Sequence, residues 1–237
     1  MMESAGAEKM NLAAPYISGV GLKIINADWL REHQVQGLFI ASHNGPTHFT
    51  DESLFLNCAL EAGVEYGVRI STTTSNVDPS TTVFYGRNHG GIEAMLSQPE
   101  FSAMNGTSLE PNVFSLMVTP IVQDGLEKYR ETGQKDPFKL MIDGDNGFAI
   151  IDAHEVGVIA AHLLALEDTS PHNSKKYVLI RPSNASGMQI VKPLEKHAGT
   201  TVDKVVFRDV FLDRKYGIGW HPGEHTAFTR FGPAKRI

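Results

Sequence analysis

The sequence predicts an α/β protein with a doubly wound parallel sheet. Short apolar segments of strand length alternate along the chain with longer segments of helical periodicity, and the connections between them are short. Residues 35–41, VQGLFIA, form a continuous apolar run, which is typical of a strand buried on both faces. The sequence has no internal repeat or linker, so its 237 residues are predicted to form a single domain, with residues 1–19 irregular and residues 211–237 a tail or lid.

Two further strands are predicted on either side of this run. Residues 21–28, GLKIINAD, have the length and composition of a short strand. Residues 64–73 form the next strand and place Val68-Arg69-Ile70 near its middle.

A helix is predicted between the strands at 35–41 and 64–73. Apolar residues in the segment 51–62 recur on or near one side of a helix. Thr50 or Asp51 can cap its first turn, and Gly63 can end it.

The alternation continues to the end of the predicted sheet. The remaining strands are predicted at residues 107–110, 138–142, 149–151, 177–181 and 202–210. The remaining helices are one that carries Tyr85 and His89 and ends before Pro99, and those at residues 112–132, 152–166 and 186–198. Pro120 is expected to kink the helix at 112–132, and Asp152 to cap the next.

The amino-acid composition indicates which kinds of partner and which cellular compartment to expect. A net charge of −6 without clustered basic residues argues against a nucleic-acid partner. No apolar run reaches the roughly 18 residues of a membrane span, and the N-terminus has no secretory signal, so the sequence predicts a cytoplasmic protein without a membrane anchor. The single cysteine, Cys58, excludes an internal disulfide and is predicted to be a buried structural thiol.

Tyr85 and His89 form a candidate acid–base pair. The spacing of four residues places both side chains on one face of the predicted helix. A phenol ordinarily has a pKa near 10 and needs a neighbouring cation or hydrogen-bond donor to act near pH 7. Ser71 and Thr72, at the end of the preceding strand, can donate to a substrate oxygen. Two ordinary helix residues are the alternative interpretation of the same spacing.

Polar loops follow several of the predicted strands. Doubly wound sheets bind ligands in the crevice at the carboxyl ends of their strands. The loops that meet this criterion are residues 42–46, 71–79, 111–112 and 143–147. They are therefore the candidate ligand-binding segments, although polar loops are common on any surface.

Three motifs resemble ligand sites but lack residues that such sites need. Gly19-Val20-Gly21 precedes a strand, so it does not form the glycine-rich loop that holds a dinucleotide pyrophosphate. A calcium loop that begins with the segment 143–147, DGDNG, would have glycine at its fifth position, Phe148 at its sixth, and His154 where a glutamate ligand is needed, so a turn is predicted instead. His221 and His225 are separated by Pro-Gly, so no metal site is predicted.

Several stretches together resemble the NmrA-like family, atypical members of the short-chain dehydrogenase/reductase superfamily, in a form common in fungi. The stretches are 22–28, 35–41, 59–64, 70–73, 89–93, 107–114, 151–157 and 177–180, and they cover about residues 20–210. The resemblance implies a Rossmann-type NAD(P)-binding fold and roles in NADP(H)-dependent reduction, in fungal secondary metabolism or in redox sensing. Compared with the family pattern, the segment with the first strand and glycine loop is absent, so the sheet is predicted to be N-terminally truncated. Its loss would expose hydrophobic sheet edges, and a partner or the first 18 residues are the alternatives for covering them.

The resemblance also implies roles for particular residues. Tyr85 and His89 match the Tyr-x-x-x-Lys pair of the superfamily, with histidine in place of lysine. Tyr85 is then the proton donor, His89 tunes it, and Ser71 and Thr72 orient the substrate oxygen. The residues expected to contact NADP(H) are Asp28, Ser42, His43, Pro111 and Asn112.

These observations favour an oxidoreductase-type enzyme that acts on a small organic molecule, with NADP as the expected cofactor and a homo-oligomer as a possible assembly. The absent glycine loop and lysine motivate one alternative, a cofactor-independent isomerase or cyclase in the same cleft. A non-catalytic, redox-sensing regulatory protein is the other alternative.

Overall fold

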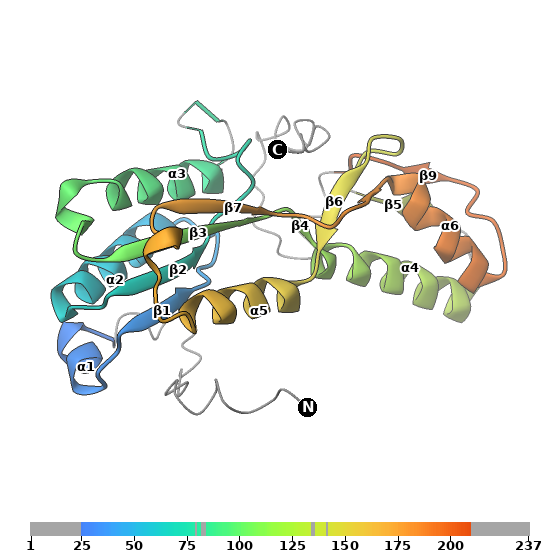
Figure 1. Cartoon of the computed structure of the whole chain (residues 1–237). Helices are drawn as coiled ribbons and strands as arrows, with labels where there is room; N and C mark the ends of the chain where they lie inside the picture. The colour runs from blue at the N-terminus through green and yellow to red at the C-terminus, as the bar shows by residue number, and fades with distance from the viewer. Residues whose placement is uncertain (1–24, 79, 82–83, 134–135, 141, 210–237) are drawn as a thin grey trace. The chain divides into compact units, whose positions relative to one another are not determined.

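The structure is a computed structural model of the 237-residue chain (Figure 1). It describes residues 25–78, 80–81, 84–133, 136–140 and 142–209. The chain divides into two compact units: unit 1 is Met1–Ser71, Asn88–Glu110 and Gly157–Tyr177, and unit 2 is Thr72–Arg87, Pro111–Val156 and Val178–Ile237. The two units are described separately below, and the assignment of one domain stays a prediction.

Unit 1 is built on a four-stranded sheet. Its strands, in spatial order, are β1 (Gly37–Ile40), β2 (Tyr66–Ile70), β3 (Asn105–Pro111) and β7 (Lys175–Leu179). The first three are parallel, with Ile40 beside Arg69 and Arg69 beside Ser108. Each predicted strand at 35–41, 64–73, 107–110 and 177–181 overlaps one of these four.

Strand β7 runs in the same direction as β3. The Ser174 N–H donates to the Gly106 carbonyl at 2.7 Å, and farther along both strands the Asn112 N–H donates to the Leu179 carbonyl at 3.1 Å. Because the residue numbers rise together on both sides, the pair is parallel. The predicted parallel sheet is therefore confirmed.

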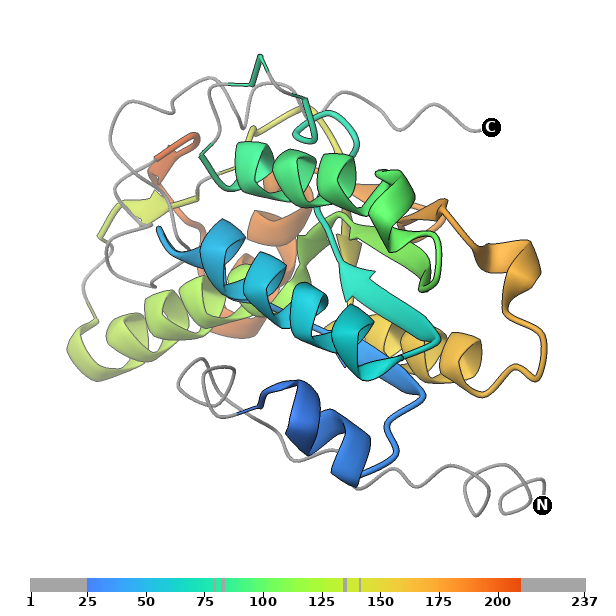
Figure 2. The same cartoon turned by 90° about the vertical axis from the view of Figure 1, so that its left-hand side faces the viewer.

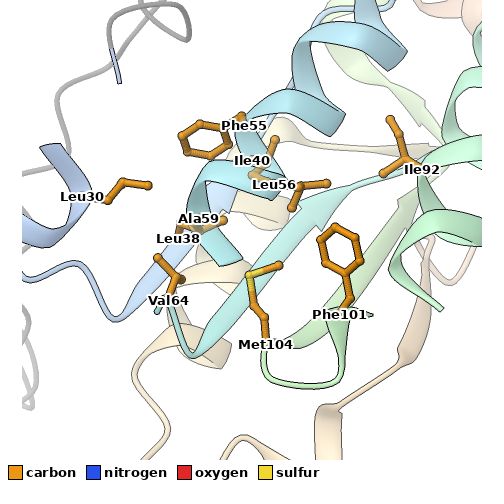
Figure 3. Close-up of a cluster of buried hydrophobic side chains, with 10 residues drawn as sticks. All are labelled: Leu30, Leu38, Ile40, Phe55, Leu56, Ala59, Val64, Ile92, Phe101 and Met104. Atoms are coloured by element: carbon orange, nitrogen blue, oxygen red, sulfur yellow. The ribbon is translucent and has the colours of Figure 1, made fainter. Parts of the chain in front are cut away.

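Helix α2 (His48–Ala62) and the unit 1 part of α3 (Phe84–Leu96) cover one face of this sheet (Figure 2). Leu38 and Ile40 of β1 point toward these helices, because alternate strand residues share a face. They pack in a buried apolar cluster drawn in Figure 3, whose other members are Leu30, Phe55, Leu56, Ala59, Val64, Ile92, Phe101 and Met104. Burial of these side chains stabilises the helix-on-sheet packing of unit 1.

The opposite face of β1 meets helix α5 (Ala153–Leu164), whose residues from Gly157 onward belong to unit 1. Gly37 points toward this face, and a Cβ atom there would lie 3.2 Å from Leu164 Cδ2. Glycine thus permits close helix–strand contact at this point. Helices on both faces of a parallel sheet agree with the predicted fold class.

The structure corrects the first predicted elements. The strand expected at 21–28 is wrong over its described part, because α1 (Ala27–Glu32) begins there. Asn26 caps this helix by accepting a hydrogen bond from the Trp29 N–H at 2.9 Å. Helix α2 begins three residues earlier than predicted, after Thr47, so neither Thr50 nor Asp51 is its cap. Gly63 ends it as predicted, with φ of 82°.

Unit 2 contains shorter strands and two long helices. Strands β4 (Val113–Phe114), β6 (Phe148–Ile151) and β8 (Asn184–Ala185) form one sheet, in which β4 and β6 are parallel and β6 and β8 antiparallel. Strands β5 (Phe138–Lys139) and β9 (Val205–Val206) form a parallel pair. Helices α4 (Thr119–Thr132) and α6 (Gly187–Ala198) pack over a second core of Val113, Val118, Ile121, Phe138, Leu140, Ile142, Phe148, Val191 and Leu194.

One long helix of unit 2 differs from the prediction. The segment 112–132 begins with β4 and a 3-10 turn, η3 (Ser115–Met117), before α4 starts. Pro120 lies in the first turn of α4. Backbone N–H groups in a first turn have no acceptor within the helix, so proline costs no hydrogen bond there and does not kink the helix. Two other 3-10 turns, η2 (Pro99–Phe101) and η4 (Ser170–His172), lie in unit 1.

Other predicted helix ends are confirmed. Asp152 Oδ1 accepts a hydrogen bond from the His154 N–H at 2.8 Å at the start of α5. Ser186 and Gln189 form a capping box at the start of α6, and Gly199 ends that helix with φ of 68°. Predictions for residues 1–19, for Gly19-Val20-Gly21 and for 211–237, which include His221 and His225, lie outside the described residues.

Candidate functional site

The helix-covered face of the unit 1 sheet has two chemically different halves. The apolar cluster of Figure 3 begins at the amino ends of the strands and extends on β1 as far as Ile40, which lies beside Arg69. Toward the carboxyl ends, Arg69 and Ser71 of the β2 segment point to the same face and are buried, with 2% and 3% of their surface exposed. A charged cluster therefore occupies the end of the sheet where parallel α/β proteins bind ligands.

Arg69 is the centre of this charged cluster. Its Nε donates to Glu52 Oε1 of α2 at 2.6 Å, and its Nη2 donates to His89 Nδ1 of α3 at 2.9 Å. Its Nη1 lies 3.6 Å from Glu93 Oε1, and the ion pair is buried on both sides. One guanidinium thus connects both covering helices to strand β2.

Glu52 is fully buried and ionised. Burial by itself would raise its pKa, but the hydrogen bond and charge of His48 and Arg69 outweigh it and lower the pKa to about 2. His48 Nε2 donates to Glu52 Oε2 at 2.8 Å from the preceding turn of α2. The Glu52 carboxylate therefore accepts one hydrogen bond from Arg69 and one from His48.

His89 is a neutral histidine with a defined tautomer. Burial lowers its pKa, and the charge of Arg69 lowers it further, to about 2. Since a guanidinium can only donate, His89 Nδ1 accepts from Arg69, and its proton is on Nε2. His89 Nε2 then donates to Asn44 Oδ1 at 3.1 Å, in the loop between β1 and α2. The protonated histidine considered as a partner for Tyr85 is thus not present at neutral pH, and the tuning role of His89 stays a prediction.

Glu93 connects the end of β2 to the strand at the far side of the sheet. Ser71 Oγ donates to Glu93 Oε1 at 2.5 Å, and Lys176 of β7 forms an ion pair with Oε2. Ser71 is therefore placed at the carboxyl end of β2, as predicted, with its hydroxyl bonded to a buried carboxylate. Its role toward a substrate stays a prediction.

The loop after β1 holds two of the residues predicted to contact cofactor. Within the described part of the chain, Ser42 Oγ is buried and has no hydrogen-bond partner. His43 is exposed and its Nδ1 accepts from the Gly45 N–H at 2.9 Å. A Cβ at Gly45 would lie 2.8 Å from His43 Nδ1, so a larger residue there would displace the His43 ring. This loop therefore offers one unsatisfied hydroxyl at the ligand end of the sheet.

Tyr85 lies in the unit 2 part of α3, one turn before His89. The Asn76 side-chain amide donates to the Tyr85 hydroxyl at 3.2 Å, and Asn76 itself is 2% exposed. A Cβ at Gly86 would lie 2.3 Å from the Asn76 carbonyl oxygen, so glycine permits this contact. Thr72 is half-buried at the start of the same loop. Asn76 thus fixes the position of the Tyr85 hydroxyl, and the catalytic role of Tyr85 stays a prediction.

The other predicted cofactor residues occupy different surroundings. Pro111 is buried at the end of β3, and Asn112 Oδ1 accepts from the Val113 N–H at 2.8 Å. Asp28 is exposed on α1 and pairs with Arg31 at 2.7 Å, which in turn bonds the Glu61 carbonyl in the last turn of α2. That turn leads into the amino end of β2, so the structure does not bring Asp28 together with Ser42.

The sequence interpretation missed most of the charged cluster. Arg69, Glu52 and Asn44 were not singled out, and Glu93 entered only through a family motif. Two signals were present: His48 and Glu52, and likewise His89 and Glu93, are spaced four apart on helices. An arginine inside an otherwise apolar strand was the third, because a buried cation requires partners.

Neither a metal site nor a membrane span is found in the described residues. Within residues 25–209 less the gaps, no group of three or more His, Cys, Asp or Glu side chains is placed to hold a metal ion. No helix of the described residues is long and apolar enough to cross a bilayer.

No protein-family model and no curated protein matches the sequence. Solved structures share the fold. An NADPH-dependent quinone oxidoreductase from Escherichia coli complexed with NADPH is 19% identical with a TM-score of 0.62, over 91% of this chain and 70% of that chain. A Citrobacter sp. triphenylmethane reductase complexed with NADP(H) is 16% identical with a TM-score of 0.58, over 90% and 73%. A nucleoside-diphosphate-sugar epimerase from Staphylococcus aureus is 15% identical with a TM-score of 0.59, over 87% and 70%. These likenesses confirm the predicted Rossmann-like fold.

Proposed function

We propose that the chain is an NADP(H)-dependent oxidoreductase-type enzyme that acts on a small organic molecule. The fold is shared with a quinone oxidoreductase complexed with NADPH and a triphenylmethane reductase complexed with NADP(H). The observation that carries the proposal for this chain is the Ser42 hydroxyl at the carboxyl end of β1, buried and without a partner among the described residues.

An unsatisfied buried hydroxyl is costly and rare in folded proteins. Ser42 follows β1 directly, and ligands of Rossmann-like sheets bind beyond the carboxyl ends of the strands. A hydroxyl offers one donor and two acceptor positions, which suits the amide, hydroxyl and phosphate groups of a dinucleotide. Ser42 therefore fits a bound cofactor, and a nicotinamide would supply hydride to the substrate.

Tyr85 is assigned the proton donor to the substrate oxygen. Its hydroxyl is held by Asn76, which leaves the ring in one position. Ser71 and Thr72, which follow β2, are assigned to orient the same oxygen. For Ser71 this requires its hydroxyl to exchange Glu93 for substrate.

The narrower assignment rests on the resemblance of sequence motifs. Those motifs favour an NmrA-like protein that is located in the cytoplasm and takes part in a fungal secondary-metabolite pathway. His43, Pro111 and Asn112 would contact the nicotinamide half of the cofactor in that form.

The test is a titration of the full chain with NADPH, followed by the cofactor's fluorescence. Binding is expected, and Ser42→Ala should raise the dissociation constant about three- to tenfold, because one hydrogen bond to the cofactor is lost. Ser97→Ala, which removes an exposed hydroxyl bonded within α3, is the matched control and should leave binding unchanged. Absence of binding at millimolar NADPH, or an unchanged constant in Ser42→Ala, would contradict the proposal.

A further inference from the structure

The charged cluster reaches the loop between β1 and α2 through one side chain. Asn44 lies in the middle of this loop, between the Ser42-His43 pair and Gly45. Its Oδ1 accepts the Nε2 proton of His89 at 3.1 Å, and His89 Nδ1 accepts from Arg69 at 2.9 Å. A chain of two hydrogen bonds thus runs from a buried guanidinium to an exposed loop.

We propose that His89 is a positioning residue that holds the loop at residues 41–47 in the shape that presents Ser42 to a ligand, with Arg69 fixing the tautomer that His89 needs. The part of this proposal that concerns the ligand rests on the proposed function. The part that concerns the loop rests on the contacts alone.

The tautomer explains why the arginine matters. A neutral imidazole has one N–H, and either ring nitrogen can carry it. Arg69 has no acceptor, so a hydrogen bond between its Nη2 and Nδ1 requires that Nδ1 be bare and that Nε2 carry the proton. Nε2 is the nitrogen that faces Asn44 Oδ1, an acceptor. With the opposite tautomer both contacts would be lost, so Arg69 sets the donor that Asn44 receives.

The same cluster anchors the far end of the loop. His48 begins α2, is fully buried, and donates through Nε2 to Glu52, which Arg69 also contacts. The His48 and His89 rings lie edge to face with centroids 4.5 Å apart. The middle and the end of the loop are therefore both tied to Arg69, whereas Ser42 itself has no hydroxyl partner in the described part of the chain.

An apolar core could cover this sheet face, as it does at the amino ends of the strands. Buried ion pairs give little net stability compared with well-packed apolar residues, because desolvation offsets the attraction. A hydrogen-bonded cluster instead holds the groups that it contacts in one defined arrangement. Those groups include Asn44 and Ser71, which lie at the carboxyl ends of two neighbouring strands.

The experiment measures amide hydrogen exchange of the loop peptide, residues 41–47, by mass spectrometry on the full chain without ligand. Asn44→Ala removes the contact from its exposed end, so the fold is not at risk, and exchange should become about fivefold faster, as expected for one hydrogen bond. Asn44→Asp retains the acceptor and should exchange like the wild type. Asn57→Ala, an exposed asparagine bonded within α2, is the matched control and should also leave the loop unchanged.

Two variants of the histidine give a second comparison. His89→Leu removes both hydrogen bonds and should speed loop exchange at least as much as Asn44→Ala. His89→Gln keeps one acceptor and one donor on a side chain of similar reach and should restore protection. Unchanged exchange in Asn44→Ala, or no rescue by glutamine relative to leucine, would overturn the positioning role.

NADPH binding then tests whether the loop acts through Ser42. If it does, Asn44→Ala should raise the NADPH dissociation constant of the wild type but should not raise that of Ser42→Ala any further. If the two residues act independently, the fold-changes of the single variants should multiply in the double variant. A multiplied loss would overturn the link to Ser42. If the wild type binds no NADPH, the proposed function fails, and the exchange measurements still decide whether His89 holds the loop.

Discussion

Arg69 is a buried cation inside the parallel strand β2, whose other residues are largely apolar and, apart from the half-buried Ile70, buried. Its guanidinium loses water there and regains partners from Glu52, His89 and Glu93. The His48 hydrogen bond and the charge of Arg69 lower the pKa of Glu52, and burial together with the charge of Arg69 lowers the pKa of His89, so Arg69 contributes to the protonation states of two neighbours. At the scale of single residues, the cluster depends on Arg69.

Removal of this guanidinium should be severe. Arg69→Leu leaves the Glu52 carboxylate buried without its cation, and the free energy of unfolding should fall by about 3–5 kcal/mol. Arg31→Leu removes an equally short ion pair, with Asp28, but on an exposed helix, and should cost less than about 1 kcal/mol. Urea unfolding of both variants makes the comparison. Equal effects would show that Arg69 does not compensate a buried charge.

At the scale of elements, local sequence signals predicted the helix ends that depend on local chemistry. Gly63 ends its helix in the left-handed region as predicted, and the helix predicted at residues 186–198 is capped by Ser186 and ends at Gly199. The missed elements depend on longer context. Residues 113–117 have the pattern of a helix, but Val113 of β4 pairs with Ile150 of β6, which lies 37 positions (150 − 113) further along the chain.

Two helical glycines should respond in opposite directions to alanine. At Gly86, in the first turn of α3, a Cβ would lie 2.3 Å from the Asn76 carbonyl, so Gly86→Ala must displace the segment that holds Tyr85. At Gly157, inside α5, nothing lies within 4 Å, and Gly157→Ala should stabilise by about 0.5–1 kcal/mol through helix propensity. Thermal unfolding should show a lower midpoint for the first and a midpoint a few degrees higher for the second. A stabilised Gly86→Ala would show that the close contact with Asn76 is not rigid.

At the scale of the whole molecule, the sequence predicted the class of fold but not the chemistry inside it. Alternating strands and helices suffice for a parallel sheet, and apolar runs such as 35–41 locate its strands. The charged cluster could not be derived in the same way, because Glu52, Arg69 and Glu93 come from three elements that only the packed sheet brings together. The prediction for Ser42 and Ser71 succeeded in placing both at strand ends, since that depends on topology alone.

The cluster also predicts how the folded state responds to acid. The pKa of His89 is about 2 in the folded chain, against an ordinary value of 6.5. Below about pH 6.5 the histidine is therefore protonated in the unfolded chain but not in the folded chain, so the free energy of unfolding falls as the pH drops. Glu52 has a folded pKa of about 2 against 4.5, and adds a second loss of the same sign only below about pH 4.5. As the pH falls from about 6.5 to about 4.5, protonation of His89 in the unfolded chain should lower the free energy of unfolding by up to about 1.4 kcal/mol per pH unit.

Urea unfolding at intervals from pH 7.5 to about pH 4.5 measures this slope. His89→Gln, which cannot take up a proton, should reduce the slope in that window, whereas His154→Gln, at an exposed position, should leave it in place. The comparison separates His89 from Glu52, because Glu52 stays ionised in the folded chain throughout this window and takes up a proton in the unfolded chain only near its lower end. A wild-type slope that survives His89→Gln would mean that His89 is not the source of the pH dependence. Protonation of Nδ1, which removes the acceptor for Arg69, would then occur without loss of stability.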